Sequence, residues 1–139
     1  MSQVIIFRND NGGVSVCTPT GEISIEAVME KDVPTGRGAK IVNATDLPNQ
    51  HNDFFNAWEM DEAGVVTVSL TKAKEITKER LRAERAPLLA AQDVLYQRAQ
   101  EANADTTAIV AEKNRLRDIT LLADAATTLD ALKAITVEA

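Results

Sequence analysis

The pattern of apolar and polar residues divides the chain into two halves of different character. In the first half, short β-branched runs alternate with polar segments rich in glycine, asparagine and proline, which is typical of strands joined by tight turns. From Thr71 onward there is no glycine and only one proline, and strong helix formers dominate. We therefore predict an α+β protein, with an antiparallel β-rich unit at residues 1–70 and an α-helical region at residues 71–139.

The first part of the β-rich unit predicts a hairpin followed by a short helix. The runs "QVIIFR" and "VSVC" flank "NDNGG", whose residues tolerate the left-handed conformations of a tight turn, so we expect strands at 3–8 and 14–18. The segment "SIEAVMEKD" places Ile25, Val28 and Met29 on one helical face. With a serine as N-cap and Pro34 as the stop, it predicts a two-turn helix lying on the sheet.

The second part of the β-rich unit predicts one more strand and a second hairpin. "AKIVN" at residues 39–43 reads as a short strand. The polar connection "ATDLPNQHND" at residues 44–53 is expected to lack regular structure, because Pro48 and the Asn/Asp cluster disfavour it. "FFNAWEMD" and "VVTVSL" flank "EAG", which predicts a hairpin over about residues 54–70.

The second half predicts a helical hairpin followed by a short last helix. Residues 71–103 form either one long helix or two in line, and residues 104–124 form another helix capped near Asp105. The turn "NAD" between them favours an antiparallel arrangement. "TTLDALKAI" predicts a final helix capped by Thr127 or Thr128.

Pro87 interrupts the segment "ERAPLLAAQDVLYQRA", which otherwise reads as a strong helix. Proline lacks the N–H that a helix interior requires, and its ring opposes the carbonyl four residues back. We therefore expect the chain to change direction at Pro87, either by a kink in one helix or by the start of a new helix there.

Two apolar stripes at helical spacing are the main candidates for packing or interaction. They consist of Leu88, Ala91, Leu95 and Ala99, and of Ile109, Leu116 and Ile119. The stripes can pair with each other, with a neighbouring subunit or with a helix of a partner. A basic leucine zipper is disfavoured, because glutamates interrupt the basic run and the leucine repeat lasts under three heptads.

Three of the chain's five large aromatic residues lie within the segment "DFFNAW". They are Phe54, Phe55 and Trp58. If exposed, they would form a binding hot spot, and if buried, they would join the sheet to the helices. Burial is favoured, because a chain rich in alanine needs its bulky side chains in the core.

Composition narrows the function classes. The net charge of −6 and pI near 4.8 favour protein partners over nucleic acid. Cys17 is the only cysteine, so an intrachain disulfide is excluded and no metal site is expected. No signal peptide or long apolar segment is recognisable, so we expect a soluble protein made inside the cell that binds no membrane. His51 lies alone in a polar loop, and we predict neither a cofactor nor enzymatic activity.

The order "ERLRAERAPLLAAQDVLYQRA", "AIVAEKNRLRDIT" and "TLDALKAI" resembles the carboxyl-terminal region of small tail proteins of tailed bacteriophages and prophages. "VIIFRNDNGGVSVCTPTGE" and "DFFNAWEMD" are similar to the amino-terminal part of such proteins, so the resemblance covers most of the chain. The recurring helical pattern falls here on Arg85, Leu88, Leu89, Asp93, Arg98, Leu116, Arg117, Asp118 and Ile119.

The resemblance implies a non-enzymatic component of a phage tail, made in the bacterial cytoplasm and resident in the virion tail. A minor structural or adaptor protein at the tail tip or fibre attachment is expected, with other tail or fibre proteins as partners and a homo-oligomer as a further possibility. The alternative is a tail or tail-fibre assembly chaperone that is absent from the mature virion. Such chaperones often carry a tryptophan where Val94 follows Asp93 here, which favours the structural role.

Overall fold

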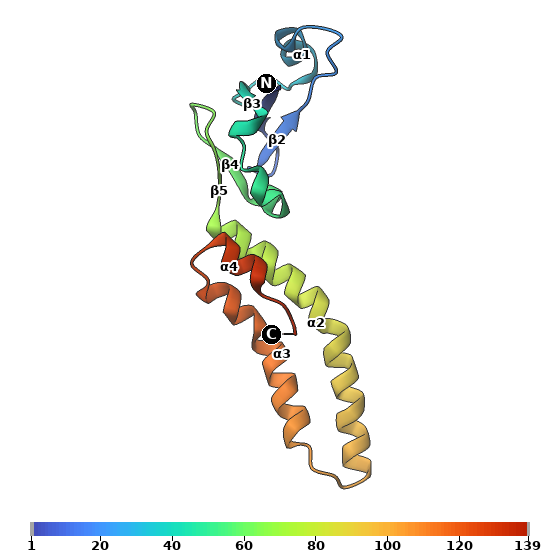
Figure 1. The fold of residues 1–139 in the computed structure, drawn as a ribbon. Coiled ribbons are helices and arrows are strands. Elements are labelled where there is room, and N and C mark those ends of the chain that lie inside the picture. The colour runs from blue at the N-terminus through green and yellow to red at the C-terminus, as the bar shows by residue number, and fades with distance from the viewer. Residues whose placement is uncertain (1, 139) are drawn as a thin grey trace. The chain divides into compact units, whose positions relative to one another are not determined.

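The structure, a computed structural model, describes residues 2–138 and divides into two compact units. The first unit ends at Ala73 and contains the strands of the described chain, whereas the second begins at Lys74 and is helical. The predicted α+β class, with an amino-terminal antiparallel sheet followed by helices, is confirmed (Figure 1).

The main sheet of the first unit has three antiparallel strands in the order β2-β1-β3. These are β1 (Gln3–Arg8), β2 (Val14–Cys17) and β3 (Lys40–Asn43). The predicted first hairpin is confirmed, with Ile6 opposite Val16 in its register. Its turn is closed by the Asn9 side chain, whose Oδ1 accepts hydrogen bonds from the backbone N–H groups of Asn11 and Gly13.

Strand β1 is buried on both faces, which explains its continuous apolar sequence. One face packs into a cluster of Val4, Ile6, Val14, Leu47, Trp58, Met60 and Val66. The opposite face places Ile5 against Val28 and Val33, from helix α1 (Ile25–Asp32) and its C-cap. The short helix therefore covers one face of the sheet, as the sequence predicts.

Helix α1 begins and ends as its sequence indicates. The Ser24 Oγ accepts a hydrogen bond from the backbone N–H of Ala27 at 3.2 Å, which satisfies one of the free donors of the first turn. The helix ends at Asp32, and Val33 is already extended. Pro34 follows, and its preference for an extended preceding residue accounts for this stop.

The prediction that residues 44–53 lack regular structure is wrong. They contain the 3₁₀ segments η1 (Ala44–Asp46) and the greater part of η2 (Asn49–Ala57). Local hydrogen bonds support these turns: the Asn49 side-chain amide donates to the Ala44 carbonyl at 2.8 Å, and the His51 N–H donates to the Pro48 carbonyl at 2.9 Å. Tight turns of this kind need no apolar periodicity, so the pattern of the sequence did not indicate them.

The second hairpin exists but is shorter than predicted. It consists of β4 (Trp58–Met60) and β5 (Val66–Val68), paired antiparallel. Residues 54–57 belong to η2 instead of a strand. In the turn, the Asp61 Oδ1 accepts from two backbone N–H groups, and Gly64 adopts a φ of 90°, a conformation that favours glycine.

The second unit contains three helices, α2 (Leu70–Glu101), α3 (Thr107–Ala125) and α4 (Leu129–Ala134), of which α2 begins in the last residues of the first unit. Helices α2 and α3 form the predicted antiparallel hairpin (Figure 1). Asn103, in the turn between them, has a positive φ of 54°, which asparagine tolerates better than most residues.

Pro87 lies inside α2, which continues unbroken from Leu70 to Glu101. The alternative in which a new helix begins at Pro87 is therefore wrong, and the expectation of one long helix is confirmed. Figure 1 shows α2 as a curved ribbon, as expected of a long helix that contains a proline. The Ala83 carbonyl, four residues back, lacks the N–H that any other residue at position 87 would offer.

The core of the second unit lies where α4 and the following residues pack against α2 and α3. Its buried members are Leu81, Leu116, Ile119 and Val137, with Leu89 and Ile135 packed at the edge. Thr128 caps α4, because its Oγ1 accepts from the Ala131 N–H at 3.1 Å. At the other end of α4, the Arg80 guanidinium donates to the Ile135 carbonyl at 2.7 Å.

Candidate functional site

The environment of helix α2 changes sharply along its length. Leu81, Leu88 and Leu95 follow one another at intervals of seven residues, yet their exposed fractions are 0%, 39% and 45%. Leu81 lies in the core with Leu116, Ile119 and Val137, whereas no residue between positions 82 and 115, all of them described, is buried. A seven-residue repeat also drifts by about 20° per heptad around a straight helix. Both effects leave Leu88 and Leu95 outside the core.

Contacts between α2 and α3 beyond the core involve Leu89 and several polar side chains. Arg85 donates to the Arg117 carbonyl at 2.7 Å, and the Lys113 ammonium lies 2.6 Å from the Asp93 carboxylate. Lys113 also lies over the Tyr96 ring, 5.1 Å from its centroid. The residues of α2 that face α3 thus include Leu89 and Tyr96, each one position after a leucine of the predicted stripe.

The structure brings together only part of the two predicted stripes. Leu116 and Ile119 are buried and Ile109 is half-buried, so the α3 stripe does face the inside of the hairpin. Its partners on α2 are Leu81 and Leu89. The alternative in which Leu88 and Leu95 pack against α3 is therefore wrong. The other two alternatives, a neighbouring subunit and a partner helix, are not tested.

The inward residues of α2 left a signal that the sequence analysis missed. Arg85, Leu89, Gln92 and Tyr96 are spaced by four, three and four residues, and all are half-buried. This spacing is as helical as that of the leucine repeat, but only one of its members is aliphatic. The stripe of Leu88, Ala91, Leu95 and Ala99 is more apolar, yet its two leucines lie on the exposed side of the helix.

An exposed apolar face remains on the outer half of α2. We define the Leu88/Leu95 face as Glu84, Leu88, Ala91, Leu95 and Arg98, residues that alternate at spacings of four and three. This spacing places them along one side of the helix. Val94, with 46% of its surface exposed, lies beside the face, and Pro87 is exposed as well.

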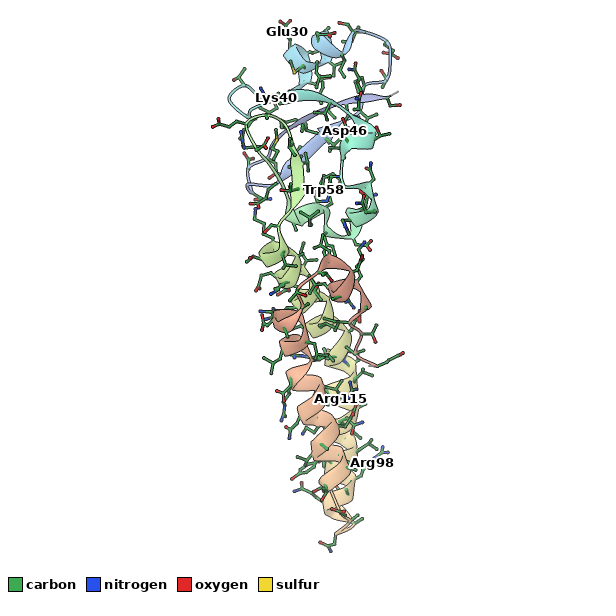
Figure 2. The ribbon with its side chains drawn as sticks, turned by 60° about the vertical axis from the view of Figure 1, so that its left-hand side comes forward. Glu30, Lys40, Asp46, Trp58, Arg98 and Arg115 are labelled. Carbon is green, nitrogen blue, oxygen red and sulfur yellow. The ribbon has the colours of Figure 1, made fainter. Side chains whose placement is uncertain are left out.

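The two ends of the Leu88/Leu95 face carry opposite charges. At one end, Glu84 pairs with Arg80 at 3.0 Å, and its side chain keeps 39% of its surface exposed. At the other end, the exposed Arg98 guanidinium makes no ion pair or hydrogen bond with any residue between 2 and 138. Figure 2 shows Arg98 near the end of the hairpin where α2 turns toward α3.

Of the three aromatic residues predicted to form either a core or a binding hot spot, two are buried and one is exposed. Phe54 and Trp58 are buried, with exposed fractions of 4% and 2%, whereas Phe55 is 36% exposed. The Phe55 and Trp58 rings are in tilted contact, with centroids 4.8 Å apart. The Trp58 Nε1 donates to the His51 carbonyl at 3.3 Å, which joins η2 to β4 (Trp58 is labelled in Figure 2).

Ionisable groups with altered pKa values lie in the helical unit and have structural causes. Hydrogen bonds from Arg115 lower the pKa of Glu112. Hydrogen bonds from the hydroxyl and N–H of Thr107, at the start of α3, lower the pKa of Asp105. Asp105 and Glu112 are each bonded to a residue two or three positions away, so these two shifts report local helix geometry. The pKa of Lys78 is raised mainly by its hydrogen bond with Asp124, which joins α2 to α3.

Within residues 2–138, no group of three or more histidine, cysteine, aspartate or glutamate side chains is placed to hold a metal ion. Cys17 is a free, half-buried residue of β2, and His51 lies in η2. No helix in this range is both long and apolar enough to cross a membrane. The Leu88/Leu95 face exposes leucine side chains along one side of a helix, a surface that suits contact with another protein.

Comparison with known proteins gives no relative for this chain. No protein-family model, curated protein or solved structure matches it.

Proposed function

We propose that this protein is a non-enzymatic component of a bacteriophage tail, acting as a minor structural or adaptor protein at the tail tip or fibre attachment. The resemblance of its sequence to small phage tail proteins carries the proposal. The exposed Leu88/Leu95 face supports a role through protein contacts, because an exposed apolar stripe on a long helix is a common docking surface for other helices.

The two units suit an adaptor in a simple physical sense. The first unit has its own two apolar clusters on the faces of β1, and the second unit has a separate core around Leu81 and Leu116. Each therefore offers a folded surface of its own, so one chain can contact two neighbours at once. Other phage tail or fibre proteins are the proposed partners, and the virion tail is the proposed location.

The second candidate function is a tail or tail-fibre assembly chaperone. The observation that favours it is the same exposed apolar face, because a chaperone must offer such a surface to a client and release it afterwards. A structural protein keeps the surface covered in the finished particle, whereas a chaperone does not accompany its client there.

Mass spectrometry of purified particles distinguishes the two roles. The adaptor proposal expects the protein in mature virions at a fixed ratio to a tail protein, and deletion of its gene is expected to yield particles with incomplete tails. Absence from virions, combined with defective tails in the deletion, favours the chaperone. Absence from virions together with normal, infectious particles in the deletion overturns both proposals.

A further inference from the structure

The Leu88/Leu95 face has a symmetry that selects its partner. We propose that it binds the same face of a second copy of this chain, with the two α2 helices antiparallel and related by a two-fold axis at Ala91. The pairing depends only on α2, so it does not rest on the proposed tail function.

The apolar residues of the face match each other in this arrangement. Ala91 of one copy lies opposite Ala91 of the other, and its small side chain lets the two helices approach closely. Leu88, three residues before the axis, lies at the level of Val94 in the second copy and one residue from Leu95. A helix rises about 1.5 Å per residue, so this offset is small compared with the length of a leucine side chain. The exposed fractions of these residues, 39% to 46%, are the surface that the pairing would cover.

The charges at the ends of the face also match. Glu84 and Arg98 each lie seven residues from Ala91, so the antiparallel arrangement brings Glu84 of each copy level with Arg98 of the other. Arg98, which has no partner among the described residues, gains one. A parallel arrangement would instead place Glu84 beside Glu84 and Arg98 beside Arg98. Like charges in such positions disfavour a complex, so the charge pattern selects the antiparallel pair.

A second copy fits these observations better than an unrelated helix. A two-fold interface requires one patch that complements itself, with each residue contacting its mirror position on the partner. The order of charge, apolar, small, apolar and opposite charge along this face meets that requirement. Because the face is only four helical turns long, its contact area is below that of a stable standard interface, and we expect a dimer that dissociates on dilution.

The first experiment uses charge reversal in the full chain. Wild-type protein is expected to change from monomer to dimer in sedimentation equilibrium over about 1 μM to 1 mM. Glu84→Arg and Arg98→Glu are each expected to raise the dissociation constant about tenfold, since both intersubunit pairs become repulsive. An equimolar mixture of the two variants is expected to dimerise again, because one copy then carries only arginine at positions 84 and 98 and the other only glutamate.

Folding of each variant is checked separately, because Glu84 also pairs with Arg80 within the chain. Matching circular dichroism spectra and urea transitions establish that a change in assembly is not a change in fold. A wild-type protein that stays monomeric over the whole range overturns the proposal. Two variants that dimerise as well alone as in the mixture also overturn the antiparallel arrangement.

The second experiment locates the axis by disulfide formation. In a Cys17→Ser background, Ala91→Cys is expected to yield a covalent dimer rapidly under mild oxidation. Ala102→Cys is the matched control: it lies just beyond α2, and its N–H still bonds to the Arg98 carbonyl at 3.1 Å. The two copies of residue 102 would be about 30 Å apart in the antiparallel dimer and close together in a parallel one. Equal cross-linking at both positions, or at residue 102 alone, overturns the proposed geometry.

Discussion

The two leucines at positions 81 and 88 provide a direct test of how the helical unit is packed. They have the same side chain, lie on the same helix and are related by one heptad. In the structure, Leu81 is completely buried whereas Leu88 is 39% exposed. Leu81→Ala and Leu88→Ala therefore remove the same atoms from two different environments, and the helix propensity gained by alanine is equal in the two variants.

The expected costs follow from burial. Leu81 packs with Leu116, Ile119 and Val137, so its truncation removes apolar contacts and leaves a cavity, at a cost of about 3 kcal/mol. Leu88 is partly in water already and leaves no enclosed cavity, so its truncation costs less than about 1 kcal/mol. At about 4–8 °C per kcal/mol for a unit of this size, Leu81→Ala lowers Tm by more than about 10 °C.

Urea and thermal unfolding followed by circular dichroism at a helical wavelength measure both costs. Samples are kept dilute, so that any association through Leu88 does not add to the stability of the wild type. Similar losses for Leu81→Ala and Leu88→Ala would refute the packing described above, because the heptad would then be buried as a continuous seam. A larger loss for Leu88→Ala would reverse the assignment of the inward face.

Three further outcomes are expected from local features of the helical unit. Thr128→Ala, which removes the N-cap of α4, should cost about 1 kcal/mol in urea unfolding, and Thr127→Ala, which removes no cap hydrogen bond, should cost much less. The Thr107 hydrogen bonds hold the pKa of Asp105 below its ordinary value of 3.8, so they stabilise α3 above that pH and are lost as pH falls through the lowered pKa. The Thr107 amide resonance should shift in that acid range in the wild type and should stay constant in Asp105→Asn. A wild-type resonance that does not move, or a variant resonance that moves as in the wild type, would contradict the assignment. Pro87→Ala restores a backbone donor and should raise the free energy of unfolding by about 1–3 kcal/mol. A variant less stable than the wild type would mean that the Pro87 ring makes a stabilising contact.

Local signals in the sequence predicted most of the first unit. The turn "NDNGG" fixed the first hairpin because the Asn9 side chain closes it, and Ser24 and Pro34 marked the ends of α1. The 3₁₀ segments from Ala44 to Ala57 were missed, because they depend on hydrogen bonds such as that of Asn49 with the Ala44 carbonyl and not on periodicity.

In the second unit the sequence predicted the helices but not their packing. Their composition placed α2 and α3 closely, and Thr128 was one of the two caps expected for α4. Which side of α2 is buried depends on where α3 and the residues after α4 lie against it, and this is a property of tertiary structure. Leu81 packs with Leu116 and Ile119 of α3 and with Val137 after α4. Leu88 is exposed because it lies on a different side of α2 from Leu89, which packs at the edge of the same core.

The core around Leu81 and Leu116 leaves the outer half of the hairpin without a core of its own. Between positions 82 and 115 the two helices have no buried side chain. The contacts that join them there include Leu89, the Arg85 hydrogen bonds and Lys113 with Asp93 and Tyr96. The Asp93 carboxylate remains open to solvent, so its ion pair with Lys113 contributes about 1 kcal/mol or less, and the two helices bury little apolar surface here. Leu88, Val94 and Leu95 are therefore apolar residues without a core to enter in one copy of the chain. In the antiparallel dimer that we propose, α2 of the second copy would cover this face, in the way that α3 and the residues after α4 cover Leu81 nearer the start of the helix.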